Sequence, residues 1–323
     1  MPRVSDTSNA LDASDVSDAS PALMLESDQG ADTFVRHTSG KARQPEQREQ
    51  TVLARLLSFR CSESQAQSLP CQDYARVLCN QEGSSISFCV CDGVGSSYKG
   101  NFAAQYLATC LVDWLQTFPA IPSKSARFLK ALHPRLDQWA HEAQEILACF
   151  EIPPDLPALV REVLEELRTT YGSETVFFCG RIDLYEASAQ RPAKERFFFQ
   201  RAAHQPRFRA LFCWMGNVSA RLYMPDQPPI ELGEVSNDEH RWSTARGRRG
   251  SVTLQTRSFD ALDRLLIYTD GLQSLQETLA DLDDEALQEQ ARELLSSATS
   301  DDMTLLDLQW SRIISTVAKE DEL

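Results

Sequence analysis

The order in which the hydrophobic periodicity changes along this chain is the feature that most limits its fold. Two short strand-like runs, at 73–79 and 85–91, are followed by amphipathic helical stretches between residues 101 and 171. From residue 173 onward short strand-like runs dominate, with one helical segment at 277–297 before the last of them. Strands that follow one another without alternating helices pair antiparallel. We therefore predict an α+β fold: an α-β-β-α sandwich of two antiparallel sheets flanked by helices.

The two ends of the chain differ in composition from the middle. Residues 1–48 are rich in Ser, Asp, Ala and Gln and poor in large apolar side chains, so they bury too little surface to offset chain entropy. We predict that 1–48 is disordered, that 49–316 is one domain and that 317–323 is an acidic tail. One of the strands expected inside the domain is RFFFQRA, at 196–202.

Charge and hydropathy exclude several classes of protein. The chain carries 32 basic and 47 acidic side chains, a net charge of -15, and such a surface repels nucleic acid. The N-terminus lacks the basic start and apolar core of a secretory signal, and no apolar run approaches the ~18 residues of a membrane span. We therefore expect a cytoplasmic protein with no membrane and no nucleic-acid partner.

Cysteine and histidine do not form a zinc motif. The nine cysteines include no CxxC pair, and the five histidines supply no pair at short spacing. Several cysteines lie inside apolar runs, as in ISFCVC at 86–91. We predict free, mostly buried thiols in a reducing compartment.

Acidic residues stand at the ends of four of the expected strands. Asp92-Gly93 closes one apolar run and Asp270-Gly271 closes another, while Asp73 opens a strand and Asp301-Asp302 directly precedes the last one. An Asp-Gly pair can simply form a hairpin turn, but helical residues follow both pairs. Carboxylates on rigid strand ends are hard oxygen ligands for Mg²⁺ or Mn²⁺. Spacing alone leaves open whether the four places meet.

Six segments taken in order give a more specific interpretation. The chain resembles the metal-dependent serine/threonine protein phosphatases of the protein phosphatase 2C type, in their bacterial-style branch, from about residue 51 to 312. The segments are QDYARV, CVCDGVGSSYKGNFAAQYLA, YGSETVFFCGRI, WMGNVSARLYM, LLIYTDGL and TSDDMTLLDL. The resemblance implies two packed antiparallel sheets with helices outside, as the periodicity does.

The resemblance also implies a site for two divalent cations, Mn²⁺ or Mg²⁺. The implied metal ligands are Asp73, Asp92, Gly93, Asp270 and Asp301, with Asp302 in a supporting place. Among these, Asp92, Asp270 and Asp301 are expected to be catalytic. A water activated by the two metals would attack the phosphorus of phosphoserine or phosphothreonine in line. The expected partner is a phosphorylated protein, with the chain acting against a Ser/Thr kinase.

Two other functions stay open at this stage. The same fold could be a binding or regulatory module without turnover, and the substrate could be a phosphoester other than a protein. A cysteine nucleophile is disfavoured, because no cysteine opens a phosphate-binding loop.

The chain departs from the family pattern at two points. Asn217 stands where the family usually has an Asp that is associated with a third metal, and Asn is a poorer ligand for a hard cation. The family's upstream phosphate-binding Arg is missing, and whether Arg60 or Arg76 replaces it is open.

A basic run, RWSTARGRRG at 241–250, falls where the family has a flap near the active site. We expect Arg246, Arg248 or Arg249 to contact a phosphopeptide. A solvated surface loop is the alternative.

Overall fold

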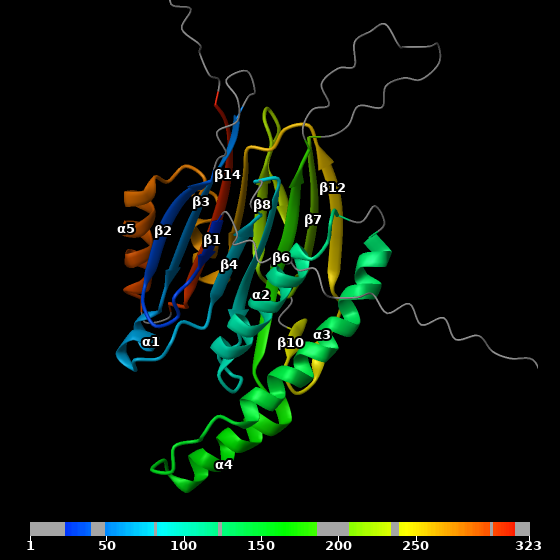
Figure 1. Ribbon diagram of the computed structural model, residues 1–323. Helices are drawn as coiled ribbons and strands as arrows, with labels where there is room; N and C mark the ends of the chain where they lie inside the picture. Colours follow the sequence, from blue (N-terminus) through cyan, green and yellow to red (C-terminus); the bar gives the residue numbers. More distant parts are fainter. Residues whose placement is uncertain are drawn as a thin grey trace, which may run out of the picture.

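Two antiparallel sheets stack face to face with helices on their outer faces (Figure 1). The computed structural model describes residues 23–39, 49–80, 83–121, 125–185, 207–233, 239–297 and 300–313. The predicted α-β-β-α sandwich is confirmed. Within these ranges no helix is both long and apolar enough to cross a bilayer.

The first sheet has the strand order β1-β4-β5-β6-β10-β11, and β7 pairs with both β6 and β12. Its strands are β1 (Leu23–Glu26), β4 (Tyr74–Cys79), β5 (Ser85–Gly93), β6 (Glu174–Leu184), β7 (Phe208–Met215), β10 (Arg241–Ser243), β11 (Gly247–Arg249) and β12 (Thr253–Phe259). The second sheet has the order β2-β3-β14-β13-β8-β9. Its strands are β2 (Thr33–Ser39), β3 (Glu49–Phe59), β8 (Ser219–Tyr223), β9 (Ile230–Leu232), β13 (Arg264–Tyr268) and β14 (Met303–Ile313).

The helices cover the outer faces of the sheets. Helices α2 (Gly100–Gln116) and α3 (Ser125–Ala148) pack on the first sheet, and α5 (Asp284–Leu295) packs on the second (Figure 1). A short α1 (Ser62–Ala66) follows β3. Helix α4 (Ala158–Glu166) and the π-helical turn η1 (Leu167–Tyr171) lead from α3 to β6. Figure 1 shows α4 extending beyond the end of the sheets.

The central strands are apolar on both faces because both faces are covered. In β5, Phe88 and Val90 point into the core between the sheets, whereas Cys89 and Cys91 point toward α2. This two-residue alternation explains why ISFCVC is a continuous apolar run. All nine cysteines are free and seven of them are buried, as the sequence predicted.

Strands β1 and β2 correct the predicted domain boundary. We expected 1–48 to be disordered, but residues 23–26 pair with β4 and residues 33–39 pair with β3. Both are edge strands, and in β1 Leu23 and Leu25 are buried while Met24 and Glu26 are exposed. Residues 1–22 and 40–48, the RFFFQRA segment and the 317–323 tail lie outside the described residues.

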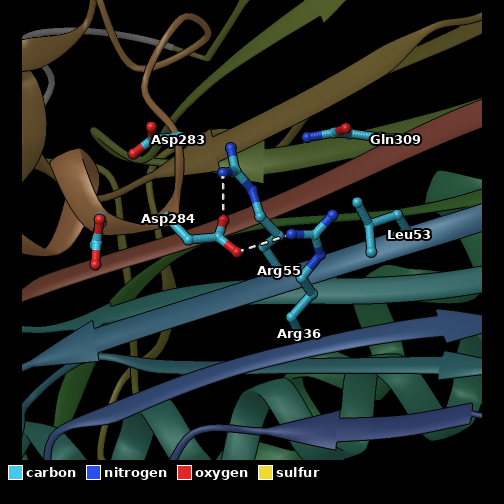
Figure 2. A pocket seen from close by; sticks show the side chains of 7 residues that line it. Arg36, Leu53, Arg55, Asp283, Asp284 and Gln309 are labelled. Carbon is cyan, nitrogen blue, oxygen red and sulfur yellow. Dashed lines mark hydrogen bonds and ion pairs between the residues drawn. The ribbon is translucent and has the colours of Figure 1, made fainter.

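A buried charge network ties β3, β13 and β14 together. The Asp307 carboxylate is fully buried and accepts hydrogen bonds from Arg55 Nε (2.6 Å) and Arg264 Nε (2.8 Å). Arg55 also donates to Asp284 at the start of α5 (2.8 Å). Figure 2 shows Asp284 between Arg55 and the more exposed Arg36, with both interactions dashed. This network fixes α5 against the second sheet.

We predict that Asp307→Ala lowers the free energy of unfolding by about 3–5 kcal/mol, because it leaves two guanidinium groups without their buried partner. Urea titration followed by circular dichroism measures this difference. Glu289→Ala, at an exposed position of α5, is the control and should change the free energy by less than about 0.5 kcal/mol. Equal stability of the two variants would contradict the importance of the network.

Candidate metal and catalytic site

The acidic residues predicted from the sequence lie at one end of the sandwich. In the first sheet Tyr74 pairs with Cys91, so Asp73 and Asp92, one residue further on, end neighbouring strands on the same side. In the second sheet the backbone N–H of Thr269 donates to Thr304 (3.0 Å), so Asp270 and the 301–302 pair end β13 and β14 on one side. The Thr269 hydroxyl donates to Asp73 (2.7 Å), which brings the two ends together.

Asp73 is a buried carboxyl among other carboxyls. Its side chain is buried and accepts a hydrogen bond from the Thr269 hydroxyl. Burial raises the pKa of Asp73 well above its usual range, and the charges of Asp92 and Asp302 raise it further. Thr269 in turn accepts a hydrogen bond from the backbone N–H of Thr304 (2.9 Å), so its hydroxyl is held in position.

The pKa of Asp92 is raised in part by carboxylates that belong to the other sheet. Burial raises the pKa of Asp92 well above its usual range, and the negative charges of Asp270 and Asp301 raise it further. Burial also raises the pKa of Asp301, while the backbone N–H of Asp302 donates to Asp301 (2.8 Å) and opposes the increase. The carboxylates from four separate segments therefore interact electrostatically.

Asp302 differs from the neighbouring acidic residues because its carboxylate binds backbone N–H groups. Its two carboxylate oxygens accept hydrogen bonds from the backbone N–H groups of Cys61 (2.7 Å) and Gln72 (2.6 Å). It therefore fixes the end of β3 and the residue before Asp73 against the start of β14. The supporting place at a metal site that is expected for Asp302 from the sequence stays a prediction.

Both glycines of the Asp-Gly pairs are required by close packing. A Cβ on Gly93 would lie 2.6 Å from the carbonyl oxygen of Gln72, and a Cβ on Gly271 would lie 2.2 Å from that of Asp302. Neither pair forms a hairpin turn: β5 continues through Gly93, and Asp270 opens a 3₁₀ turn, η3 (Asp270–Leu275). The glycines let one strand end approach another at the site.

The side chains fit a hard divalent cation in chemical type. Oxygen ligands dominate at this end of the sandwich, and the charges that raise the pKa values of Asp73 and Asp92 belong to carboxylates. Over the described ranges, no three His, Cys, Asp or Glu side chains are grouped so that they could hold a metal ion as they stand. The assignment of individual ligands, including the Gly93 carbonyl, stays a prediction.

Comparison with known proteins decides the family. The sequence matches the protein phosphatase 2C family over residues 61–307. This chain is a member of that family. No curated protein sequence matches it.

Several solved structures are similar to this chain at low sequence identity. Stp1, a serine/threonine phosphatase of Staphylococcus aureus, is 13% identical over 79% of this chain and 94% of its own, with a TM-score of 0.50. The serine/threonine phosphatase of S. agalactiae is 12% identical over 80% and 99% of the two chains, with a TM-score of 0.49. RsbX, solved with magnesium, is 12% identical over 85% and 100%, with a TM-score of 0.45.

Asn217, the residue at which the sequence analysis expects the chain to depart from the family pattern, contacts the predicted site directly. Its Nδ2 group donates to Asp270 Oδ2 (3.0 Å). An Asp at this position would place a second negative charge against Asp270, whereas the amide donor holds the Asp270 carboxylate. Asn217 therefore acts here as a positioning partner for Asp270.

A pocket of about 280 Å³ borders this site. Its lining residues are Ser96, Ser97, Leu167, Tyr171, Glu174, Arg241 and Arg249. Glu174 is buried and accepts hydrogen bonds from Arg241 and Arg249, each at 3.1 Å. The backbone N–H of Glu174 donates to Ser97 Oγ (3.1 Å), and Thr175, the next residue, donates to the Asp92 carbonyl (2.7 Å). The pocket therefore shares its wall with the Asp92 strand end.

The three arginines expected to contact substrate point to different places. Arg249 lines the pocket, with 38% of its side chain exposed. Arg246 stacks over the Tyr171 ring (4.3 Å) and donates to the Thr170 carbonyl, and Arg248 donates to Asp137 on α3 (3.3 Å). Arg249 is therefore the one of these three arginines whose side chain lines the pocket.

The two upstream arginines have acidic neighbours. Arg60 lies 3.6 Å from Asp32, and Arg76 donates to Asp113 on α2 (3.0 Å).

Three residues of this region escaped the sequence analysis: Thr269, Glu174 and Ser97. Each lies within a segment that carries the family resemblance: Thr269 in LLIYTDGL, Glu174 in YGSETVFFCGRI and Ser97 in CVCDGVGSSYKGNFAAQYLA. Hydroxyl and carboxyl side chains are too common in such segments for their position to be a signal before the strands are paired.

We predict that Asp92→Asn raises the unfolding free energy of the metal-free protein. A carboxyl whose pKa is raised on folding binds more protons when folded, so its contribution to stability is full at low pH and falls as pH rises through the folded pKa. The stabilisation of Asp92→Asn relative to the natural chain should therefore be small near pH 4 and should grow toward pH 8, to roughly 1–3 kcal/mol.

Urea unfolding in chelator from pH 4 to 8 measures this difference. Asp263→Asn, at an exposed carboxylate, is the control and should show no such trend. A pH-independent destabilisation by Asp92→Asn would contradict the like-charge account.

Proposed function

We propose that this chain is a Mn²⁺- or Mg²⁺-dependent phosphatase that hydrolyses phosphoserine and phosphothreonine in proteins. Its partners would be phosphorylated proteins, and it would act against a Ser/Thr kinase. The observation that supports the proposal is that four acidic strand ends lie at one end of the sandwich, connected by the Thr269–Asp73 hydrogen bond, in a member of the protein phosphatase 2C family.

The proposed metal ligands are Asp73, Asp92, Gly93, Asp270 and Asp301. When bound, two divalent cations would supply positive charge that acidifies a water molecule and neutralises the phosphoryl oxygens. The catalytic part is assigned to Asp92, Asp270 and Asp301.

Other residues of the chain would hold these ligands in place. The hydroxyl of Thr269 fixes one oxygen of Asp73, and the amide of Asn217 fixes one oxygen of Asp270. Side chains locked by such bonds lose little entropy when a ligand binds, which favours a precise site.

For the Cys71 thiol, which lies close in sequence to Asp73, direct attack by water fits better than attack by cysteine. Cys71, two residues before Asp73, is buried, and its burial raises the pKa of the thiol well above its usual range. A nucleophilic cysteine requires a lowered pKa and access to substrate. We therefore propose one displacement by water without a covalent phosphoenzyme.

A second candidate function is a phosphatase-fold regulatory module without turnover. One observation favours it: Asn217 occupies a position where the family usually has a ligand, and its amide donates to Asp270. Metal-dependent turnover separates the two functions.

We expect hydrolysis of a phosphothreonine peptide and of p-nitrophenyl phosphate with Mn²⁺ or Mg²⁺ and none with chelator. Asp270→Asn should lower kcat by about 100-fold or more, because a charge that holds the cation is lost. Phosphate release measures both. Asp263→Asn is the matched control on an exposed carboxylate and should keep full activity. Folded protein without metal-dependent activity would support the regulatory module.

We predict that Arg249→Ala raises KM for a phosphothreonine peptide by about tenfold, the loss of one charge-assisted hydrogen bond to phosphate. Steady-state kinetics measures this change. Arg248→Ala is the matched control, because Arg248 faces Asp137, and it should leave KM within about twofold. Equal KM values for the two variants would argue that the basic run is only a solvated loop.

A further inference from the structure

Helix α4 exposes an apolar face that nothing in the described chain covers. None of its nine residues is buried. Leu159 is 71% exposed, Val160 41% and Val163 47%. We call these three residues the α4 face.

A helix of this kind requires a packing partner to be stable. Isolated helices shorter than about 12–15 residues are marginal in water, and most helices gain their stability by burying an apolar face. Helix α4 contains nine residues, and its apolar residues gather on one side. Exposed apolar side chains gathered in this way are typical of interaction surfaces.

The α4 face leads toward the candidate site. Helix α4 continues directly into η1, where Leu167 and Tyr171 line the pocket beside Asp92. At about 100° per residue, Val160, Val163 and Leu167 fall on the same side of the helix, and the π-helical turn continues from Leu167 to Tyr171. At about 1.5 Å per residue, Val160 lies roughly 16 Å along the axis from Tyr171. A peptide bound on the α4 face can therefore reach the pocket beside Asp92 with only a few further residues.

The borders of the α4 face indicate the chemistry of its partner. On one side, Arg168 donates to the Phe150 carbonyl (2.7 Å) and Leu164 is half-buried, so the turn after α3 covers that flank. On the other side, helical periodicity places Glu162 and Glu166 next to Leu159, and both are exposed. The open part of the surface is therefore apolar with an acidic border.

We propose that the α4 face is a docking site for the phosphoprotein substrate. It would bind a short amphipathic segment whose apolar side chains cover Leu159, Val160 and Val163 and whose Lys or Arg side chains face Glu162 and Glu166. About five extended residues span the distance from Val160 to Tyr171, so the segment would lie about that far from the phosphorylated residue. The proposal rests on the proposed function and adds a substrate class to it.

A second copy of the chain fits this surface less well. A symmetric pair would bring the Glu162 and Glu166 borders of two chains together, in a protein with a net charge of -15. Like charges at an interface oppose association. A basic segment instead complements the border.

Two synthetic peptides test the proposal. The first carries phosphothreonine about five residues from a helical segment with Leu at i, i+3 and i+4 and Lys on the adjacent side. The second has the three Leu residues replaced by Ser. We expect the natural chain to hydrolyse the first peptide with about tenfold higher kcat/KM. The double variant Leu159→Ser/Val163→Ser should lose this preference and keep its rate on p-nitrophenyl phosphate.

Met24→Ser is the matched control, because Met24 is a 53% exposed apolar residue of the edge strand β1, and it should keep the preference. Equal kcat/KM of the natural chain for both peptides would overturn the proposal. Sedimentation that shows a dimer lost in the double variant would also overturn it, because a second copy would then cover the face.

Failure of the proposed function is distinguishable from failure of docking. If no variant turns over any phosphoester, fluorescence anisotropy of the same labelled peptides still measures binding. If the natural chain binds the Leu peptide and Leu159→Ser/Val163→Ser weakens this binding, the result would support docking without the proposed phosphatase activity. Equal binding of the Leu and Ser peptides would overturn it.

Discussion

The buried carboxylate of Asp73 is the constraint on which the rest of the site depends. It begins a strand of the first sheet and accepts its hydrogen bond from Thr269, at the end of a strand of the second sheet. Asp302 adds a second connection, because it accepts from the backbone of Gln72, next to Asp73. The two sheets are therefore fixed to each other at the end where acidic residues gather. Gly93 and Gly271 permit this approach, since any Cβ there would meet a backbone oxygen.

Two groups of acidic residues in this protein have opposite electrostatic surroundings. Asp307 lies between Arg55 and Arg264, so its charge is neutralised inside the fold. Asp73 and Asp92 instead have other carboxylates as their electrostatic neighbours, and their pKa values are raised. The first arrangement stabilises the sandwich, whereas the second lowers stability at neutral pH unless positive charge arrives. This contrast, rather than the number of acidic residues, marks the candidate site.

The sequence predicted the layers of the fold because periodicity reports which faces are buried, as in ISFCVC. It missed β1 and β2, whose pairing with β4 and β3 depends on partners distant in sequence. The acidic strand ends were found from local motifs, but only strand pairing places Asp73 beside Thr269. The separate directions of Arg246, Arg248 and Arg249 also depend on tertiary contacts, with Tyr171, Asp137 and Glu174, that a basic run does not encode.

Calorimetric titration of the metal-free protein with Mn²⁺, in two buffers of different ionisation enthalpy, tests the central claim most directly. Carboxylates with raised pKa values must lose protons when a cation binds, so the account predicts saturable binding with a buffer-dependent heat that shows proton release. Asp92→Asn should abolish or strongly weaken this binding. No binding by the folded natural chain, or unchanged binding by Asp92→Asn, would contradict a cation site built from these strand ends.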